Sequence, residues 1–166
     1  MATSRHKPGR VREVHFADAA TLRSLITPEW SEWGAERLIT KADIKTFADL
    51  TDNHQWIHED EARCVNESPY GALIAHGFLI LALLPGLLPP EPFQVVGYRQ
   101  RIVRGSDHFR FPAPIFPGDT VHTRVHLQEV RTSKNNRGTI LFRDTEVWST
   151  VGTKPAVVCS LQLQYF

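Results

Sequence analysis

The chain has 166 residues and a formal net charge of +1, with 42% hydrophobic and 22% charged residues. This length and composition suit a single globular domain that buries its own core, and the nearly neutral charge gives no reason to expect a nucleic acid or a membrane surface as the partner. No segment reaches the ~20 apolar residues of a membrane span, and no apolar stretch of a secretory signal follows the basic N-terminus. The two cysteines, Cys64 and Cys159, form no CxxC pair. They indicate reduced thiols, so we expect a cytoplasmic protein.

The sequence predicts two parts, a flexible basic tail over residues 1–16 and one folded domain over residues 17–166. At the start of the domain, Asp18 precedes apolar residues at helical spacing, which predicts a helix over residues 18–26.

A second helix is predicted after Thr40, because Asp43 follows this Thr cap at the spacing of a capping box. Its apolar stripe is expected to comprise Ile44, Phe47, Ala48 and Leu50. The helix should end near residues 51–53, where short polar side chains compete for backbone hydrogen bonds. A further short helix is expected over residues 60–66.

The apolar segment over residues 71–88 is hydrophobic nearly all round, which is typical of a buried helix. Pro85 and the prolines at 89–90 bound or kink it. A short apolar run also fits a buried strand, but Leu and Ala outnumber the β-branched residues here and favour a helix.

The C-terminal half is predicted to be rich in strands. The expected strands cover residues 95–103, 107–111, 119–131, 139–150 and 156–166. Apolar and polar residues alternate over 121–128, as in a sheet with one wet face, and turn signals stand at 116–119 and 135–138. One buried helix followed by an antiparallel meander predicts an α+β fold in which a curved sheet wraps the helix.

Candidate functional residues gather at the start of the buried helix. If this helix begins within residues 75–77, its first amides lack acceptors and carry partial positive charge. The backbone around Ala75, His76 and Gly77 would then stabilise the enolate oxygen of a thioester, with Tyr70 close by. The alternative is that His76 is a capped core residue and Gly77 a packing residue.

A second polar segment lies just before it. Asp52, Asn53, His54, Gln55 and His58 fall within seven residues. A carboxylate and an imidazole on one loop can share a water, which one orients while the other takes its proton. The alternative is a polar loop around a structural Trp56.

The same residues also allow a metal site. His54 and His58 are four residues apart and His76 could be a third ligand. The loop looks non-helical, however, and no HExxH pattern is present. Because there is also no phosphate-binding Gly-rich loop and no GxSxG elbow, we expect neither a metal nor a cofactor.

Together, Phe47-Ala-Asp-Leu-Thr-Asp-Asn-His-Gln-Trp-Ile-His-Glu-Asp60 and Pro69-Tyr-Gly-Ala-Leu-Ile-Ala-His-Gly77 resemble the hydratase-2 motif of MaoC-like enoyl-CoA hydratases. The His-Gln-Trp-Ile-His variant is similar to the NodN-like branch, as are residues 110–119. The resemblance runs from about Trp30 to the C-terminus. It implies a hot-dog fold with a central helix over about 75–88, a homodimer whose sheets join edge to edge, and an acyl-CoA or acyl-carrier-protein substrate.

The resemblance also implies the reaction, a reversible R-specific hydration of a trans-2-enoyl thioester. In the family an Asp and a His activate the water, and a backbone amide near the Ala-His-Gly turn polarises the thioester carbonyl. His58 matches the family His. Asn53 stands where the family has its Asp, and Asp52 falls where the family usually has Gly. An Asn amide can orient water but cannot accept a proton at ordinary pH.

This departure leaves several interpretations open. Asp52 could take the catalytic position after a local backbone shift, or His58 could be the sole base with Asn53 orienting the water. The protein could instead be a thioesterase, add an internal hydroxyl, or bind acyl thioesters without catalysis. Asp107 and His108 are weaker candidates for lining the site, with exposed strand residues as the alternative.

Overall fold

This computed structural model describes residues 11–133 and 138–166. The strands are β1 (Arg12–His15), β2 (Arg37–Leu38), β3 (Phe93–Val96), β4 (Arg101–Arg110), β5 (Thr120–Thr132), β6 (Thr139–Ser149) and β7 (Val157–Tyr165). The helices are α1 (Ala19–Arg23), α2 (Lys41–Thr51), α3 (Trp56–Glu59), α4 (Glu61–Glu67) and α5 (Gly77–Leu87).

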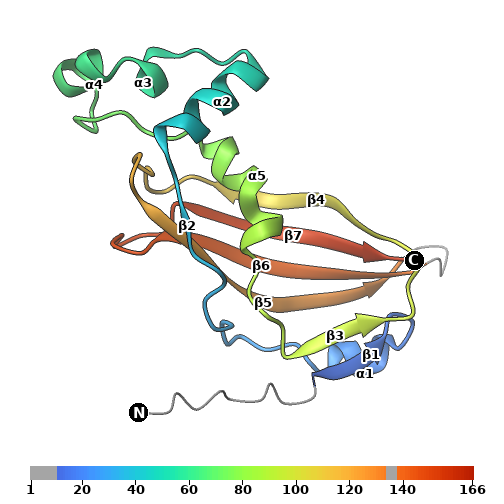
Figure 1. Cartoon of the computed structure of the whole chain (residues 1–166). Helices are drawn as coiled ribbons and strands as arrows, with labels where there is room; N and C mark the ends of the chain where they lie inside the picture. Colours follow the sequence, from blue (N-terminus) through green and yellow to red (C-terminus); the bar gives the residue numbers. More distant parts are fainter. Residues whose placement is uncertain (1–10, 134–137) are drawn as a thin grey trace, which may run out of the picture.

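The molecule is built on a five-stranded antiparallel sheet with the strand order β2-β5-β6-β7-β4. A second, two-stranded sheet pairs β1 with β3 in parallel. Figure 1 shows α5 lying against one face of the large sheet, while α2, α3 and α4 project beyond one end of it. The predicted α+β fold, a curved antiparallel sheet around one central helix, is confirmed.

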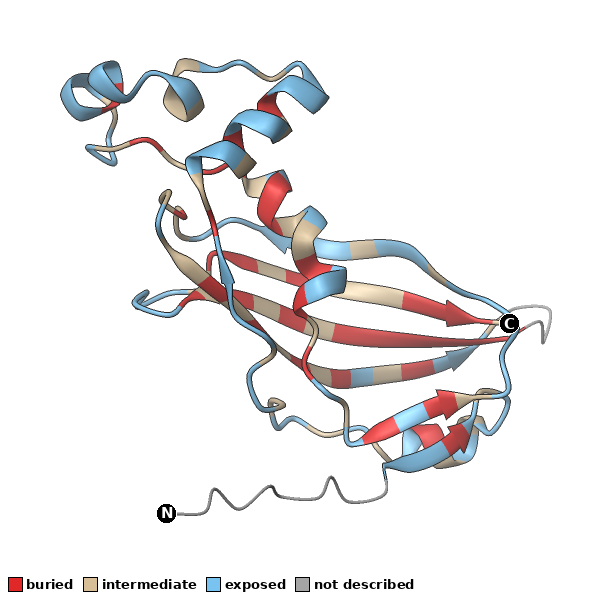
Figure 2. Ribbon diagram, viewed as in Figure 1, coloured by how far each residue is buried: buried red, intermediate tan, exposed pale blue. Residues whose placement is uncertain are grey.

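The main core lies between α5 and the sheet. Ile80 and Leu84 of α5 pack in one cluster with Val121 of β5 and Val147 of β6, and Figure 2 shows the buried residues along these elements. The alternation of buried and partly buried residues along β5 follows from the period of two in an extended strand, which turns every second side chain toward the helix. This packing holds α5 so that its first turn faces the projecting helices.

The N-terminal predictions are partly correct. Asp18 caps α1, since its carboxylate accepts the Thr21 N–H at 3.0 Å. The flexible tail predicted over residues 1–16 extends too far into the chain, because Arg12–His15 form strand β1. Val14 of this strand is buried in a second hydrophobic cluster together with Phe93 and Val95. Local pattern missed this strand because its partner is distant in the sequence, with Arg12 paired to Phe93 of β3. Residues 1–10 lie outside the described residues.

Helix α2 has the predicted capping box, in which Thr40 and Asp43 satisfy each other's backbone N–H groups. The helix ends at Asp52, which adopts a left-handed conformation with φ 53°. Leu50 does not belong to the buried stripe, because it is 80% exposed. It is six residues after Ile44, which at 3.6 residues per turn turns it away from the buried side. The short helix predicted over residues 60–66 corresponds to α4.

Helix α5 starts at Gly77, within the range of 75–77 considered for its first residue but six residues after the start of the apolar segment. Residues 71–76 are not helical, because backbone groups in this segment pair with other elements. The Ile74 N–H donates to Ile57 O at 3.2 Å, and the Ala75 N–H donates to Ile115 O at 2.7 Å. The helix is also not buried all round, since Phe78 is 57% exposed.

The predicted division between a strand over residues 95–103 and a strand over residues 107–111 is wrong. The chain breaks at Gly97, whose φ of 79° is left-handed, and β4 then runs without interruption over Arg101–Arg110 with two register shifts. The turn at 116–119 is confirmed, with the Asp119 N–H donating to Phe116 O at 3.0 Å. Most of the turn predicted at 135–138 lies outside the described residues.

Among the residues that the structure describes, no helix combines the length and the apolar character needed to cross a membrane.

Candidate active site

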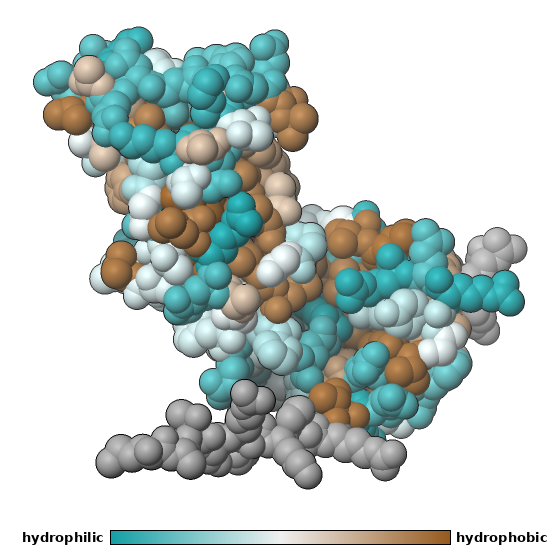
Figure 3. Space-filling model, viewed as in Figure 1, coloured by the Kyte–Doolittle hydropathy of each residue, from teal (hydrophilic) through white to brown (hydrophobic). Residues whose placement is uncertain are grey.

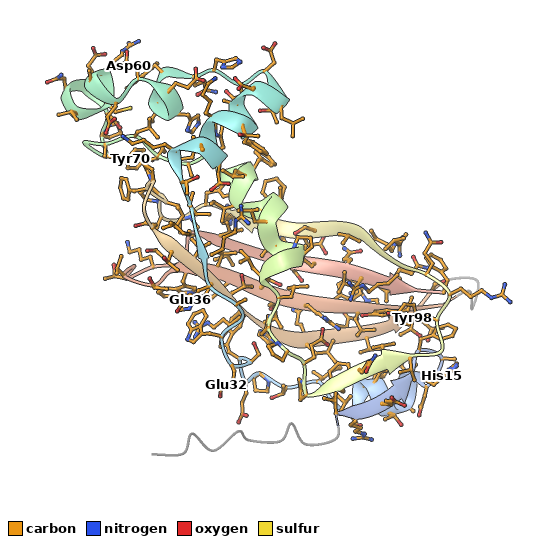
Figure 4. All side chains as sticks on the ribbon, viewed as in Figure 1. His15, Glu32, Glu36, Asp60, Tyr70 and Tyr98 are labelled. Carbon is orange, nitrogen blue, oxygen red and sulfur yellow. The ribbon has the colours of Figure 1, made fainter. Side chains whose placement is uncertain are left out.

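A cavity of about 570 Å³ opens where the projecting helices meet the first turn of α5 and the segment between β4 and β5. Its lining includes Asn53, His58, Tyr70, Ala75, His76, Gly77, Phe47, Thr51, Gln55, Phe111 and Ile115. Six of the seven predicted site residues therefore share one cavity, and the seventh, Asp52, is not part of its lining. Tyr70, labelled in Figure 4, lies on the segment between α4 and α5.

His58 lies on α3, a single helical turn that the sequence did not predict. Its Nδ1 is 2.8 Å from Ile74 O. A carbonyl oxygen only accepts, so this contact requires the proton on Nδ1 and leaves the Nε2 lone pair free. Burial of the imidazole, opposed by the Ile74 bond and aided by the nearby His76, lowers the pKa of His58 below 6.5. The ring is thus held neutral near pH 7, with one nitrogen able to accept a proton.

His76 is the residue directly before α5 and is 3% exposed. Its Nε2 lies 3.1 Å from Asn53 O, and its ring stacks on that of His58 with 3.7 Å between centroids and 26° between planes. The loop that carries Asn53 and His58 is thereby joined to the amino end of the central helix.

The first amides of α5 provide the electrophilic side of the cavity. Within the described residues, the N–H groups of His76, Gly77 and Phe78 donate no hydrogen bond. They carry the partial positive charge of a helix N-terminus. The expectation that Ala75 also offers its amide is wrong, because that N–H is already donated to Ile115 O.

Gly77 has no room for a side chain. A Cβ atom at this position would lie 2.7 Å from Cδ1 and 2.8 Å from Cε1 of Phe111. The Phe111 ring therefore packs directly against the first turn of α5 and closes the cavity on that side.

Asn53 and Asp52 differ sharply in placement. Asn53 lines the cavity. Asp52 has a fully exposed side chain, and its Oδ1 lies 3.8 Å from Nε2 of His54, which also lies outside the cavity. Asp52 is also the left-handed residue that ends α2, with φ at 53°.

The outer side of this loop carries a group of possible metal ligands. Ligand atoms of Asp49, His54 and Glu59 lie within 4.8 Å of one another, and all three residues are exposed. Their polar atoms already have partners, since Lys45 Nζ lies 2.9 Å from Asp49 Oδ1 and His54 Nδ1 lies 3.0 Å from Glu59 Oε1. The hydrogen bond to Glu59 raises the pKa of His54.

Two residues of the cavity lining, Phe111 and Ile115, were not predicted from the sequence. Phe111 and Ile115 enter the cavity because the segment after β4 folds back onto residues 74–77, a contact that local pattern does not reveal. The similarity of residues 110–119 to the NodN-like branch was the available signal. Asp107 and His108 lie on β4 away from this cavity, where Asp107 accepts a hydrogen bond from Gln162.

A curved antiparallel sheet wrapped around one helix, with a cavity at the helix N-terminus, defines a hot-dog protein. Solved structures agree on the fold. The (R)-hydratase from A. caviae superposes with a TM-score of 0.64 at 24% identity, covering 85% of this chain and 97% of that one. The MaoC-like dehydratase from Rhodospirillum rubrum gives 0.66 at 22% identity, covering 87% and 95%.

Sequence comparisons go further. The family model described as "MaoC like domain" matches residues 31–147. The chain is 38% identical over 128 residues to 3-hydroxyacyl-thioester dehydratase Z of Mycobacterium tuberculosis, covering 76% of this chain and 82% of that protein. It is 38% identical over 127 residues to Nodulation protein N of Rhizobium meliloti, covering 73% of each. The chain belongs to the MaoC-like domain family, as the motifs around His58 and Gly77 predicted.

Proposed function

We propose that the protein catalyses the reversible hydration of a 2-enoyl thioester to a 3-hydroxyacyl thioester. Membership of the MaoC-like domain family supports this, as does similarity to a relative named as a 3-hydroxyacyl-thioester dehydratase. The observation that carries the proposal is geometric: an imidazole whose Nδ1 donates to a backbone carbonyl shares one cavity with helix N-terminal amides that have no acceptor among the described residues.

In the hydration direction His58 is the general base. Its Nε2 takes a proton from water as the water oxygen bonds to C3 of the enoyl group, and the electron pair of the C2–C3 double bond moves toward the thioester carbonyl. The protonated His58 then returns a proton to C2 as the carbonyl re-forms. No atoms other than those of water are added, and the same steps reversed give dehydration.

The amides of His76, Gly77 and Phe78 are the donors to the enolate oxygen. They have no backbone acceptor among the described residues and are fixed before the substrate arrives, so they require no reorganisation as charge develops. Removal of one such donor typically costs about 2.7–4 kcal/mol of transition-state stabilisation.

Asn53 is the orienting group for the water. Its amide can donate to, or accept from, a water molecule but cannot take its proton. This favours a mechanism with His58 as the sole base, since the exposed Asp52 lies outside the cavity. The same Asn also supports a second candidate, an acyl-thioester-binding subunit without turnover.

We also propose that the protein acts as a homodimer in the cytoplasm. Within the described part of the chain, β4 pairs only with β7 and leaves its other edge free. Phe78, Phe109 and Phe111 form an aromatic group beside this edge that is 40–57% exposed, and Figure 3 shows further apolar surface over the region of α5. Pairing of two β4 edges would cover this group. Both cysteines are free and buried, which suits a reducing compartment.

The test is a hydration assay that follows loss of the enoyl absorbance, with crotonyl-CoA, longer enoyl-CoA esters and the same acyl groups on a carrier protein. We expect turnover that His58→Ala reduces by about 10²–10⁴-fold, with an unchanged circular dichroism spectrum. Binding of the esters without turnover would favour the non-catalytic alternative, and release of free thiol would favour a thioesterase. Light scattering on the same preparation measures the mass and tests the dimer.

A further inference from the structure

His76 contacts both halves of the proposed site. It donates from Nε2 to the Asn53 carbonyl, 3.1 Å away, and its ring lies between His58, at 3.7 Å, and Phe47 of α2, at 5.2 Å between centroids. A single side chain at the start of α5 therefore contacts the loop that bears Asn53, the helical turn that bears His58, and helix α2.

The hydrogen-bonding state of His76 argues against a purely structural role. The Asn53 carbonyl only accepts, so Nε2 carries the proton and Nδ1 is an acceptor. That Nδ1 is buried and has no protein partner among the described residues. A buried acceptor without a partner destabilises the fold, and an apolar ring of similar size would avoid this penalty. The imidazole is thus a poor choice for packing alone.

We propose that His76 is a positioning residue that holds the His58 imidazole and the Asn53 backbone in fixed relation to each other. The inference rests on the proposed function and gives the His76 side chain a role of its own, beside the role proposed for the His76 backbone amide. Stacking on His76 restricts rotation of the His58 ring. The hydrogen bond from His76 Nε2 to the Asn53 carbonyl fixes the distance between the Asn53 backbone and the start of α5. The water that bridges Asn53 and His58 then meets C3 of the substrate in one geometry.

The pKa of His58 provides a second way to test the contact between the two rings. His76 contributes to lowering the pKa of His58, after burial. The other titratable groups near His58 are Glu59 on its own helical turn, which acts in the opposite direction, and Tyr70 in the cavity lining. Residues 111–115, which close the cavity, include no titratable side chain. Because the charged form of each imidazole repels the charged form of the other, removal of the His76 imidazole should raise the pKa of His58.

Two matched variants of His76 separate its stacking contact with His58 from its hydrogen bond to Asn53. His76→Phe keeps a flat ring against His58 but loses the donor to Asn53, and His76→Gln keeps a donor but loses the ring. We expect each to lower kcat by up to about 100-fold, the loss typical of a misplaced reacting group, with a much smaller change in KM. The acidic limb of the rate profile should move to higher pH. The control is His108→Asn, which lies outside the cavity at a positive φ that Asn also adopts.

Nuclear magnetic resonance of the histidine rings tests the same proposal without activity. In the wild-type protein we expect the His76 proton on Nε2 and the His58 proton on Nδ1, and the His58 titration should shift upward in His76→Phe and His76→Gln. Wild-type kcat in both variants, or a fall in kcat with no shift of the His58 titration, would overturn the proposal. If the variants do not fold, a wild-type His76 whose proton is on Nδ1 overturns it. An inactive wild-type protein with the expected ring states would count against the proposed function and leave the coupling of the two rings intact.

Discussion

Asn53 lines the cavity, whereas the carboxylate of its neighbour Asp52 is fully exposed and points toward His54. The two residues are adjacent in sequence, but only Asn53 is part of the cavity lining. The carboxylate of Asp52, considered as a replacement for the family Asp, therefore lies outside the cavity.

Asn53→Asp should increase the hydration rate. A carboxylate in the cavity beside His58 would share the proton transfer, and a second acid–base group contributes up to about 10²–10⁴-fold. We expect at least a tenfold rise in kcat, measured with the enoyl substrate that the wild-type protein turns over best. Asp52→Asn is the matched control and should leave kcat unchanged. A large loss in Asp52→Asn would mean that the loop rearranges to bring this carboxylate into the site.

Gly77→Ala should lower kcat/KM without unfolding the protein. The new methyl group would lie under 3 Å from the Phe111 ring and force that ring into the cavity next to the free amides. Gly86→Ala, in the same helix, meets no atom within 4 Å. It should keep full activity and stabilise the protein by about 0.5–1 kcal/mol in chemical denaturation. Equal activity of the two variants would contradict the placement of the substrate carbonyl at the first turn of α5.

The hydration rate should fall at acid pH with an apparent pKa below 6.5. His58 must be neutral to accept a proton, and burial lowers its pKa from the ordinary value of 6.5. The rate constant kcat/KM should be flat above this pKa and fall tenfold for each unit of pH below it. The pKa of His54 is shifted in the opposite direction, because its hydrogen bond to Glu59 raises it. A His54→Gln variant with the same acidic limb would assign the limb to His58, and loss of the limb would assign it to His54.

Thr40→Ala should destabilise the fold by about 1 kcal/mol, since loss of an N-cap removes a partner from the first turn of the helix. Here Thr40 Oγ1 accepts the Asp43 N–H at 3.0 Å. Thr153→Ala, at an exposed position after β6, is the control for the loss of a threonine. Urea denaturation of both variants measures the difference, and equal midpoints would show that the capping box adds nothing to stability.

What could be predicted from the sequence was largely local. The caps at Asp18 and Thr40 depend on residues a few positions apart, and both are present. The polar segment was recognised as well, but His58 lies on the unpredicted helical turn α3 and not in a loop. The meeting of Ala75 with Ile115 and of Val14 with Val95 joins distant segments, and no periodicity encodes such pairs. These contacts decide which amide is free and where the folded part begins, so both were predicted wrongly.

The exposed face of α5 was also mispredicted because burial depends on contacts between distant segments. Hydrophobicity all round a helix predicts burial all round, but it does not say what provides the cover. In this chain the sheet buries Ile80 and Leu84 and leaves Phe78 exposed. Leu50 was misplaced for a simpler reason, since the stripe through Ile44 and Ala48 does not continue to it at helical spacing.

The bond from His58 Nδ1 to Ile74 O ties the base to the strip of chain that continues into the free amides of residues 76–78. The proton acceptor is thus hydrogen-bonded to the segment that carries the oxyanion donors. A ligand that displaces these amides would also displace Ile74 and, through the hydrogen bond, the His58 imidazole. Binding of the acyl group and activation of water are therefore coupled. Changes at Ile74 or its neighbours would alter affinity and turnover in step.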